Sequence, residues 1–219
     1  MSLYVFLRTG RRALLSKVVW PAPEDGEPGA WIETGSDVPP DAIRACPVEE
    51  LLWWIDDELW AAELEGDPRT EGHAVVAARG RLVSRVESWT PEAATELAEA
   101  CAFRARDAAA EALDRAGREH EARDLSACHS PEALEKVGTE IAERGTDAAA
   151  RLAGFAADTA LYARKAPDPV RAAAVAAYVA AHAVAGGDKT VASYEAQFAD
   201  ERRWQAEWLT RRLRLSSTG

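Results

Sequence analysis

Three helix starts of the same kind follow residue 90, and they constrain the fold more than any other feature of the sequence. A capping residue precedes a proline in TPEA at 90–93, SPEA at 130–133 and DPVR at 168–171. Ser, Thr and Asp side chains accept hydrogen bonds from the first free amides of a helix, and proline at the first helical position loses no bond. Glycines after the Ala-rich stretches are typical of helix ends. Together these signals predict helices over residues 91–116, 131–144, 147–165, 169–185 and 190–213.

The short links between these helices predict an antiparallel bundle over residues 90–219. Its alanines favour helix and allow neighbouring helices to approach closely. Residues 1–89 differ, because they hold six of the eight tryptophans and most of the prolines. We therefore predict an α+β protein with two domains: a small mixed strand and helix domain at residues 1–89, and an Ala-rich bundle of about five helices at residues 90–219.

Short β-like runs separated by turn formers fill the first part of the chain. LYVFLRT and ALLSKVVW flank a Gly-Arg-Arg turn, which predicts a β-hairpin. AWIETG predicts a short strand, and the paired prolines of SDVPPDA predict a loop. VEELLWWI has apolar residues at helical spacing, whereas ELWAAELEG fits either a continued helix or a strand. HAVVAARGRLVSRVESW is rich in Val around a Gly and predicts a strand or hairpin.

The charge balance narrows the range of partners. The formal net charge is −11, which argues against nucleic acid and anionic membranes, because both require a positive surface. No apolar run approaches the ~20 residues that span a bilayer. The first residues do not resemble a signal peptide, because their apolar run is short and the arginines follow it. We therefore expect a cytoplasmic protein, with Cys46, Cys101 and Cys128 as reduced thiols.

The segment at 48–66, VEELLWWIDDELWAAELEG, combines tryptophans with acids and contains no Lys, Arg or His. Aromatic anchors supply affinity and complementary charge speeds encounter, so this pattern favours a surface for a basic protein partner. Placing every tryptophan outside would expose an unusually large apolar patch, so we expect at least one of the paired tryptophans to face the core and the acids to face water. The predicted partner-binding residues are Trp53, Trp54, Asp56, Asp57, Glu58 and Trp60.

No motif in the chain specifies a reaction, a metal or a cofactor. His120, Asp124, Cys128 and His129 lie within ten residues, but they lack the paired short spacing of a structural zinc site. We interpret them as a polar loop between helices, with no metal and no cofactor. GxSxG and Gly-rich phosphate loops are absent from the sequence, so no catalytic residue is nominated. Cys101 and His182 lie on apolar helix faces, which is typical of core residues.

Two stretches resemble known groups of proteins. IRACPVEELLWWIDDELWAAELEG followed by HAVVAARGRLVSRVESW resembles a small domain of uncharacterised actinobacterial and phage proteins, with Arg44 where relatives often carry His. The resemblance implies strands at 58–65 and across 74–86, and no known activity. The ending AAYVAAHAV…FADERRWQAEWLTRRL is similar to Ala-rich helical immunity proteins, and this similarity implies a protein that neutralises a toxin by binding it.

Three hypotheses follow from these observations. The first is a non-enzymatic, immunity-like protein-binding module that neutralises a basic partner. The alternative is an enzyme of unrecognised class, with a site in a cleft between the two parts. The third is an oligomeric protein, for instance a homodimer with Trp204 and Trp208 at its seam. Candidate residues for the enzyme are Cys46, His73, Arg79 and Arg81.

Overall fold

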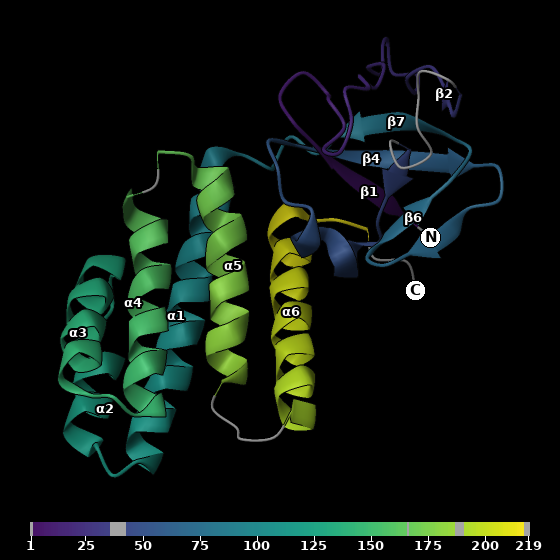
Figure 1. Cartoon of the computed structure of the whole chain (residues 1–219). Coiled ribbons are helices and arrows are strands. Elements are labelled where there is room, and N and C mark those ends of the chain that lie inside the picture. The colour runs from purple at the N-terminus through teal and green to yellow at the C-terminus, as the bar shows by residue number, and fades with distance from the viewer. Residues whose placement is uncertain (1, 36–42, 166, 187–190, 217–219) are drawn as a thin grey trace. The chain divides into compact units, whose positions relative to one another are not determined.

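A computed structural model describes residues 2–35, 43–165, 167–186 and 191–216. The loop predicted for SDVPPDA, residues 36–42, lies outside the described residues. Contacts divide the chain into two compact units: Met1–Thr90 with Ala206–Gly219, here called the strand unit, and Pro91–Gln205, here called the helix unit. The fold is α+β, with antiparallel strands preceding the helices (Figure 1). That residues 1–89 and 90–219 are separate domains stays a prediction.

The strand unit contains two antiparallel sheets. The larger sheet has the order β1 (Leu3–Leu7), β4 (Glu58–Glu65), β7 (Arg79–Arg85) and β2 (Ile32–Glu33). The smaller sheet has the order β3 (Arg44–Ala45), β6 (Ala74–Val76) and β5 (Arg69–Glu71). A 3-10 helix, η2, covers Val48–Trp53, where the apolar spacing predicts a helix.

The partner of β1 is β4, and the predicted hairpin of β1 with the following segment is wrong. Leu3 pairs with Ala62 and Leu7 pairs with Glu58. The chain after β1 forms only isolated bridges, and Gly10 and Arg11 both adopt positive φ angles of 78° and 60°. These two residues turn the backbone away from regular pairing.

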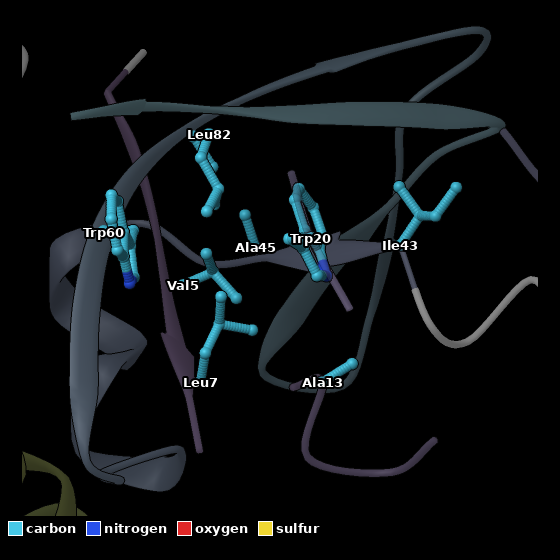
Figure 2. Packing of buried hydrophobic residues seen from close by; sticks show 9 residues of the cluster. Val5, Leu7, Ala13, Trp20, Ile43, Ala45, Trp60 and Leu82 are labelled. Atoms are coloured by element: carbon cyan, nitrogen blue, oxygen red, sulfur yellow. The ribbon is translucent and has the colours of Figure 1, made fainter. Parts of the chain in front are cut away.

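Figure 2 shows the apolar core on one face of β1. Val5, Trp20 and Leu82 point toward one another there, and Trp60 and Ile43 join the same cluster. Trp20 and Leu82 are fully buried. On the other face of β1, the ring of Phe6 meets Trp89 edge to face, with 5.3 Å between the ring centroids. Successive residues of a strand point to opposite faces, so β1 is covered on both sides.

The chain at 58–65 is strand β4, which decides between the helix and strand readings of ELWAAELEG. Its register against β7 shifts between Ala61 and Ala62, which marks a β-bulge. The end of the last helix belongs to the same unit. Ser88 Oγ donates to the Leu213 carbonyl at 3.2 Å, and the Ser216 amide donates to Tyr4 Oη at 2.9 Å.

The helix unit follows the predicted helices closely. Ser130 Oγ accepts from the Ala133 amide at 3.2 Å, and an Asp168 carboxylate oxygen accepts from the Arg171 amide at 3.1 Å, as the capping pattern predicts. Helices α3, α4, α1 and α5 stand side by side (Figure 1). None of the helices among the described residues is long and apolar enough to cross a membrane. The helices are α1 (Pro91–Arg115), α2 (Glu119–Ser126), α3 (Pro131–Arg144), α4 (Ala148–Lys165), α5 (Pro169–Ala185) and α6 (Val191–Leu213).

One short helix was not predicted. Residues Glu119–Ser126 form α2, where the sequence analysis places a polar loop. The helix buries Ala122 and Leu125, and it has no side-chain cap at its start. Capping signals therefore could not reveal it, and packing of Leu125, which is fully buried, stabilises it instead.

Candidate functional site

The segment at 48–66 supplies both core and surface. Leu51 and Leu52 are buried, as expected for the apolar side of η2. Trp60 is only 7% exposed and lies in the core cluster of the strand unit. It is therefore not part of an exposed surface, because the β4 register turns its side chain toward Val5 and Leu82. Of the three tryptophans, Trp53 is the exposed one, at 38%.

Trp53 is held in place by the turn between β5 and β6. Its ring stacks on the His73 imidazole, with 4.1 Å between centroids and an angle of 12° between the planes. His73 Nδ1 lies 2.7 Å from a Glu50 carboxylate oxygen. Trp54 Nε1 donates to the His73 carbonyl at 2.9 Å, and the Arg44 guanidinium lies 5.2 Å from the Trp54 ring centroid. These contacts order an exposed indole before any partner binds.

Two of the predicted acids, Asp57 and Glu58, hold the turn that follows β1. One Asp57 oxygen accepts from the Thr9 amide at 2.8 Å and from the Thr9 hydroxyl at 2.6 Å. Glu58 accepts from the Gly10 amide at 2.9 Å and from Trp60 Nε1 at 3.1 Å. All these donors are neutral, so the hydrogen bonds fix the two carboxylates without cancelling their charges.

Asp56, the first of the three consecutive acids, has a different role. Its main-chain carbonyl accepts from Trp89 Nε1 at 3.0 Å, and its carboxylate lies 3.9 Å from Arg8 Nε. A pair at that separation between partly exposed groups contributes little stability. The structure thus divides the predicted site into two groups. Trp53 and Trp54 contact His73, whereas Asp57 and Glu58 contact Thr9 and Gly10.

The residues considered for an enzyme have separate partners. Cys46 is buried, and burial raises the pKa of its thiol, with smaller contributions from Glu50 and Glu49. A nucleophilic cysteine needs a lowered pKa instead. Arg79 and Arg81 lie on β7, where their Nε atoms donate to Glu65 at 2.9 Å and Glu63 at 2.7 Å.

Those two arginines also cover one tryptophan. The guanidinium carbons of Arg79 and Arg81 lie 4.7 Å and 4.6 Å from the Trp31 ring centroid. The acids opposite them balance their charge, which indicates a stabilised sheet surface. Trp31, like Trp54, is partly exposed, and the two guanidinium groups lie over its ring.

An apolar cavity lies beside Trp54, lined by Tyr4, Phe6, Leu14 and Cys46 among others. Its enclosed volume is about 20 Å³, enough for roughly one water molecule. Ligand pockets typically enclose hundreds of Å³. This cavity therefore offers no room for a substrate.

No group of three side chains able to hold a metal ion occurs among the described residues. His120 Nδ1 lies 3.6 Å from Asp124 on α2, and the Cys128 thiol donates to the Asp124 carbonyl at 3.4 Å. The His120 side chain is 81% exposed. These contacts of His120, Asp124 and Cys128 therefore lie within α2 or directly after it.

The buried thiols should react slowly in the native protein. Burial is the main cause that raises the pKa of Cys46, Cys101 and Cys128, and each is at most 3% exposed. Because reaction requires local opening, we expect modification by a thiol reagent at pH 8 to be about 100-fold slower than in the unfolded chain. Timed labelling with mass spectrometry measures this. A cysteine that reacts as fast as in the unfolded chain would be accessible in the native protein and would again be a candidate nucleophile.

A polar cluster inside the helix unit escaped the sequence analysis. Glu201 on α6 is fully buried and accepts from Arg104 on α1, through Nη2 at 2.6 Å and Nε at 3.1 Å. Gln205 Nε2 donates to Glu201 at 3.3 Å and to the Ala177 carbonyl at 2.9 Å. Desolvation raises the pKa of Glu201, and Arg104 opposes this effect. The i, i+4 spacing of Glu201 and Gln205 was visible in the sequence, but their orientation was not.

Comparison of the chain with protein-family models, with curated proteins and with solved structures finds no match. The resemblance of residues 1–89 to a small actinobacterial and phage domain therefore stays a prediction. The similarity of the C-terminal stretch to immunity proteins also stays a prediction.

Proposed function

We propose that the protein is a non-enzymatic binding module that captures a basic protein partner through its strand unit. The contact surface, here called the Trp53 surface, consists of Glu49, Glu50, Trp53, Trp54 and His73. The observation that carries the proposal is the exposed Trp53 indole, which is stacked on His73 while Glu50 holds the imidazole.

An ordered tryptophan is well suited to anchor a partner. Tryptophan is enriched among the residues that dominate binding energy, because it buries a large area with few rotatable bonds. The stack on His73 restricts the Trp53 ring before binding. Less side-chain entropy is then lost on association, which increases the net affinity.

The acids of the strand unit favour a basic partner. Glu49 is exposed, and among the described residues no Lys or Arg pairs with Asp57 or Glu58. Their charges add to a chain with a formal net charge of −11. Uncancelled negative charge on the unit that carries the aromatic anchor accelerates encounter with positively charged proteins and disfavours nucleic acid.

An immunity-like role is part of this proposal, in which binding neutralises a basic toxin. Such a role needs no catalytic group, and Trp53 with its neighbouring acids would meet the toxin directly. A cytoplasmic location is also proposed. Its support is that Cys46, Cys101 and Cys128 are free thiols, which suits a reducing compartment.

Replacing Trp53 tests the proposal. The full chain, its Trp53→Ser variant and a Trp31→Ser control serve as baits for proteins from the source organism, and the captured protein is then titrated in purified form. We expect a basic protein whose affinity falls about 30-fold with Trp53→Ser and changes little with Trp31→Ser. The affinity should also fall as salt is raised from 50 to about 300 mM.

Circular dichroism must show that both variants are folded. A partner that binds the Trp53→Ser variant as tightly as the wild type would remove the Trp53 surface from the proposal. Equal losses with Trp31→Ser would show that a general change in the strand unit, and not this surface, causes the effect.

A further inference from the structure

Helices α4 and α5 carry their large apolar side chains outside and their alanines inside. The buried positions of α5 are Val170 and eight alanines, and those of α4 are mainly alanine. In contrast, Phe155 is 41% exposed, Tyr162 39%, Val175 38% and Tyr178 48%. Large apolar groups gathered on the outer face of neighbouring helices mark an interaction surface.

The exposed residues follow one spacing on both helices. On α4 the exposed positions are 151, 155, 158 and 162. On α5 they are 171, 175 and 178, and His182, which is partly buried and hydrogen-bonded to Tyr194 of α6, continues the same steps of four, three and four. This spacing aligns side chains in a stripe along a helix and is the spacing used at helix–helix seams. The α4–α5 face is defined here by Arg151, Phe155, Asp158, Tyr162, Arg171, Val175, Tyr178 and His182.

The charges on α4 are arranged symmetrically around Phe155. Arg151 lies one turn before it and Asp158 one turn after it. Among the described residues neither Asp158 nor Arg151 takes part in an ion pair, and the Arg151 side chain donates to the Thr146 carbonyl at 3.3 Å. The surrounding apolar groups desolvate Asp158 and raise the pKa of its carboxyl group. A cation supplied from outside would offset this cost.

We propose that the α4–α5 face is the interface of a homodimer, in which α4 packs antiparallel on α4 of a second copy about a two-fold axis level with Phe155. The axis lies in the interface, perpendicular to the helices. It exchanges the residues before and after Phe155, so Arg151 of each copy meets Asp158 of the other. A two-fold interface requires this self-complementarity of one surface patch.

The shape of the α4–α5 face also fits the proposed two-fold axis. A groove at the start of α4 is lined by Ala148, Leu152, Phe155, Val179, His182 and Tyr194. Ala148 lies seven residues before Phe155 and Tyr162 lies seven after it, about 10.5 Å in each direction at 1.5 Å per residue. The axis therefore brings Tyr162 of one copy level with the groove of the other, which places a protruding ring opposite a hollow.

The same axis relates the two α5 helices. Tyr178 lines the groove together with Phe155, so the two rings lie at a similar level of the bundle. The two-fold operation then gathers Phe155 and Tyr178 of both copies near the centre of the interface. Aromatic residues at the centre and charged residues toward the edge are the common arrangement of protein interfaces.

A charge-swap series on the full chain tests this interface. Sedimentation velocity and light scattering measure the mass of wild type, Asp158→Arg, Arg151→Asp and the double variant, with Glu111→Arg on α1 as a control. We expect a wild-type dimer, dissociation constants raised at least tenfold by each single change, and recovery in the double variant. The control also replaces an acid with arginine, but at a position outside the α4–α5 face, so it should remain dimeric.

Either of two results overturns the proposal. One is a wild-type monomer at about 100 µM, which would leave the face to a different protein. The other is a dimer that the single changes leave intact, which would place the seam elsewhere, for instance at Trp204 and Trp208. A Phe155→Ser variant, checked by circular dichroism, supplies a second test, because it removes the apolar centre and leaves the charges.

Discussion

Replacing Trp60 with alanine is expected to lower the free energy of unfolding by about 3–5 kcal/mol, the range found for large aromatic residues removed from cores. Its indole is 7% exposed and packs in the cluster that contains Val5 and Leu82. Truncation would leave a cavity in the strand unit. It would also leave Glu58 without the hydrogen bond from Trp60 Nε1 at 3.1 Å.

Urea unfolding, followed by circular dichroism and tryptophan fluorescence, measures this loss. Trp53→Ala is the matched control, because the residue lies in the same segment and its side chain is 38% exposed. We expect the control to cost about 1 kcal/mol or less. Equal losses at the two positions would contradict the division of the segment into core and surface.

Replacing Arg104 with methionine should lower the free energy of unfolding by about 3 kcal/mol at pH 7, because it leaves the buried Glu201 carboxylate without its cation. Arg104 donates to Glu201 at 2.6 Å and 3.1 Å, and the Glu201 side chain is fully buried. Methionine keeps much of the aliphatic length of Arg104 and loses its guanidinium, whose carbon lies 4.7 Å from the Trp204 ring centroid.

The loss should depend on pH in a defined direction. Desolvation already raises the pKa of Glu201 above its ordinary value of 4.5, and removal of Arg104 raises this pKa further. The folded variant then binds a proton more tightly than the unfolded chain, so this group reduces stability as pH rises through the interval between the two pKa values. The deficit relative to wild type is therefore largest at neutral pH and shrinks as pH falls toward 4.5.

Urea unfolding of wild type and variant at several values between pH 7 and 5 tests this direction. The double variant Arg104→Met and Glu201→Gln has no ionisable group at the buried position, so this position should add no pH dependence to its own free energy of unfolding. Arg144→Met removes an exposed ion pair with Glu140 and should cost less than about 1 kcal/mol. A deficit that grows on acidification would show that removal of Arg104 does not raise the pKa of Glu201, and it would contradict this account of the pair.

Helices were predictable where the signal is local. Ser130 and Asp168 bond to amides only three residues away, so capping and periodicity predict α3 and α5 correctly. The pairing of β1 was not predictable in this way. Its partner β4 lies more than fifty residues further along the chain, and the nearer segment with similar composition made the hairpin look favourable.

The candidate site also combines features that the sequence predicts with features that only the tertiary structure decides. Sequence composition identified an acidic and aromatic segment, and the structure left Trp53 exposed and placed Trp60 in the core. His73, which orders Trp53, lies twenty residues away and had no signal that linked it to the tryptophan. The role of Glu50 depends on that same contact.

The sequence by itself determined the α+β class, the approximate bounds of the five predicted helices and the excess of negative charge, because capping, periodicity and charge act over a few residues or by simple addition. Tertiary structure alone decided which large side chains face water. A strand presents its residues to two faces in turn, and a helix presents them all around. Only the packing against distant segments therefore decided that Trp60 is core, that Trp53 is surface, and that Phe155 and Tyr178 lie outside a bundle packed with alanine.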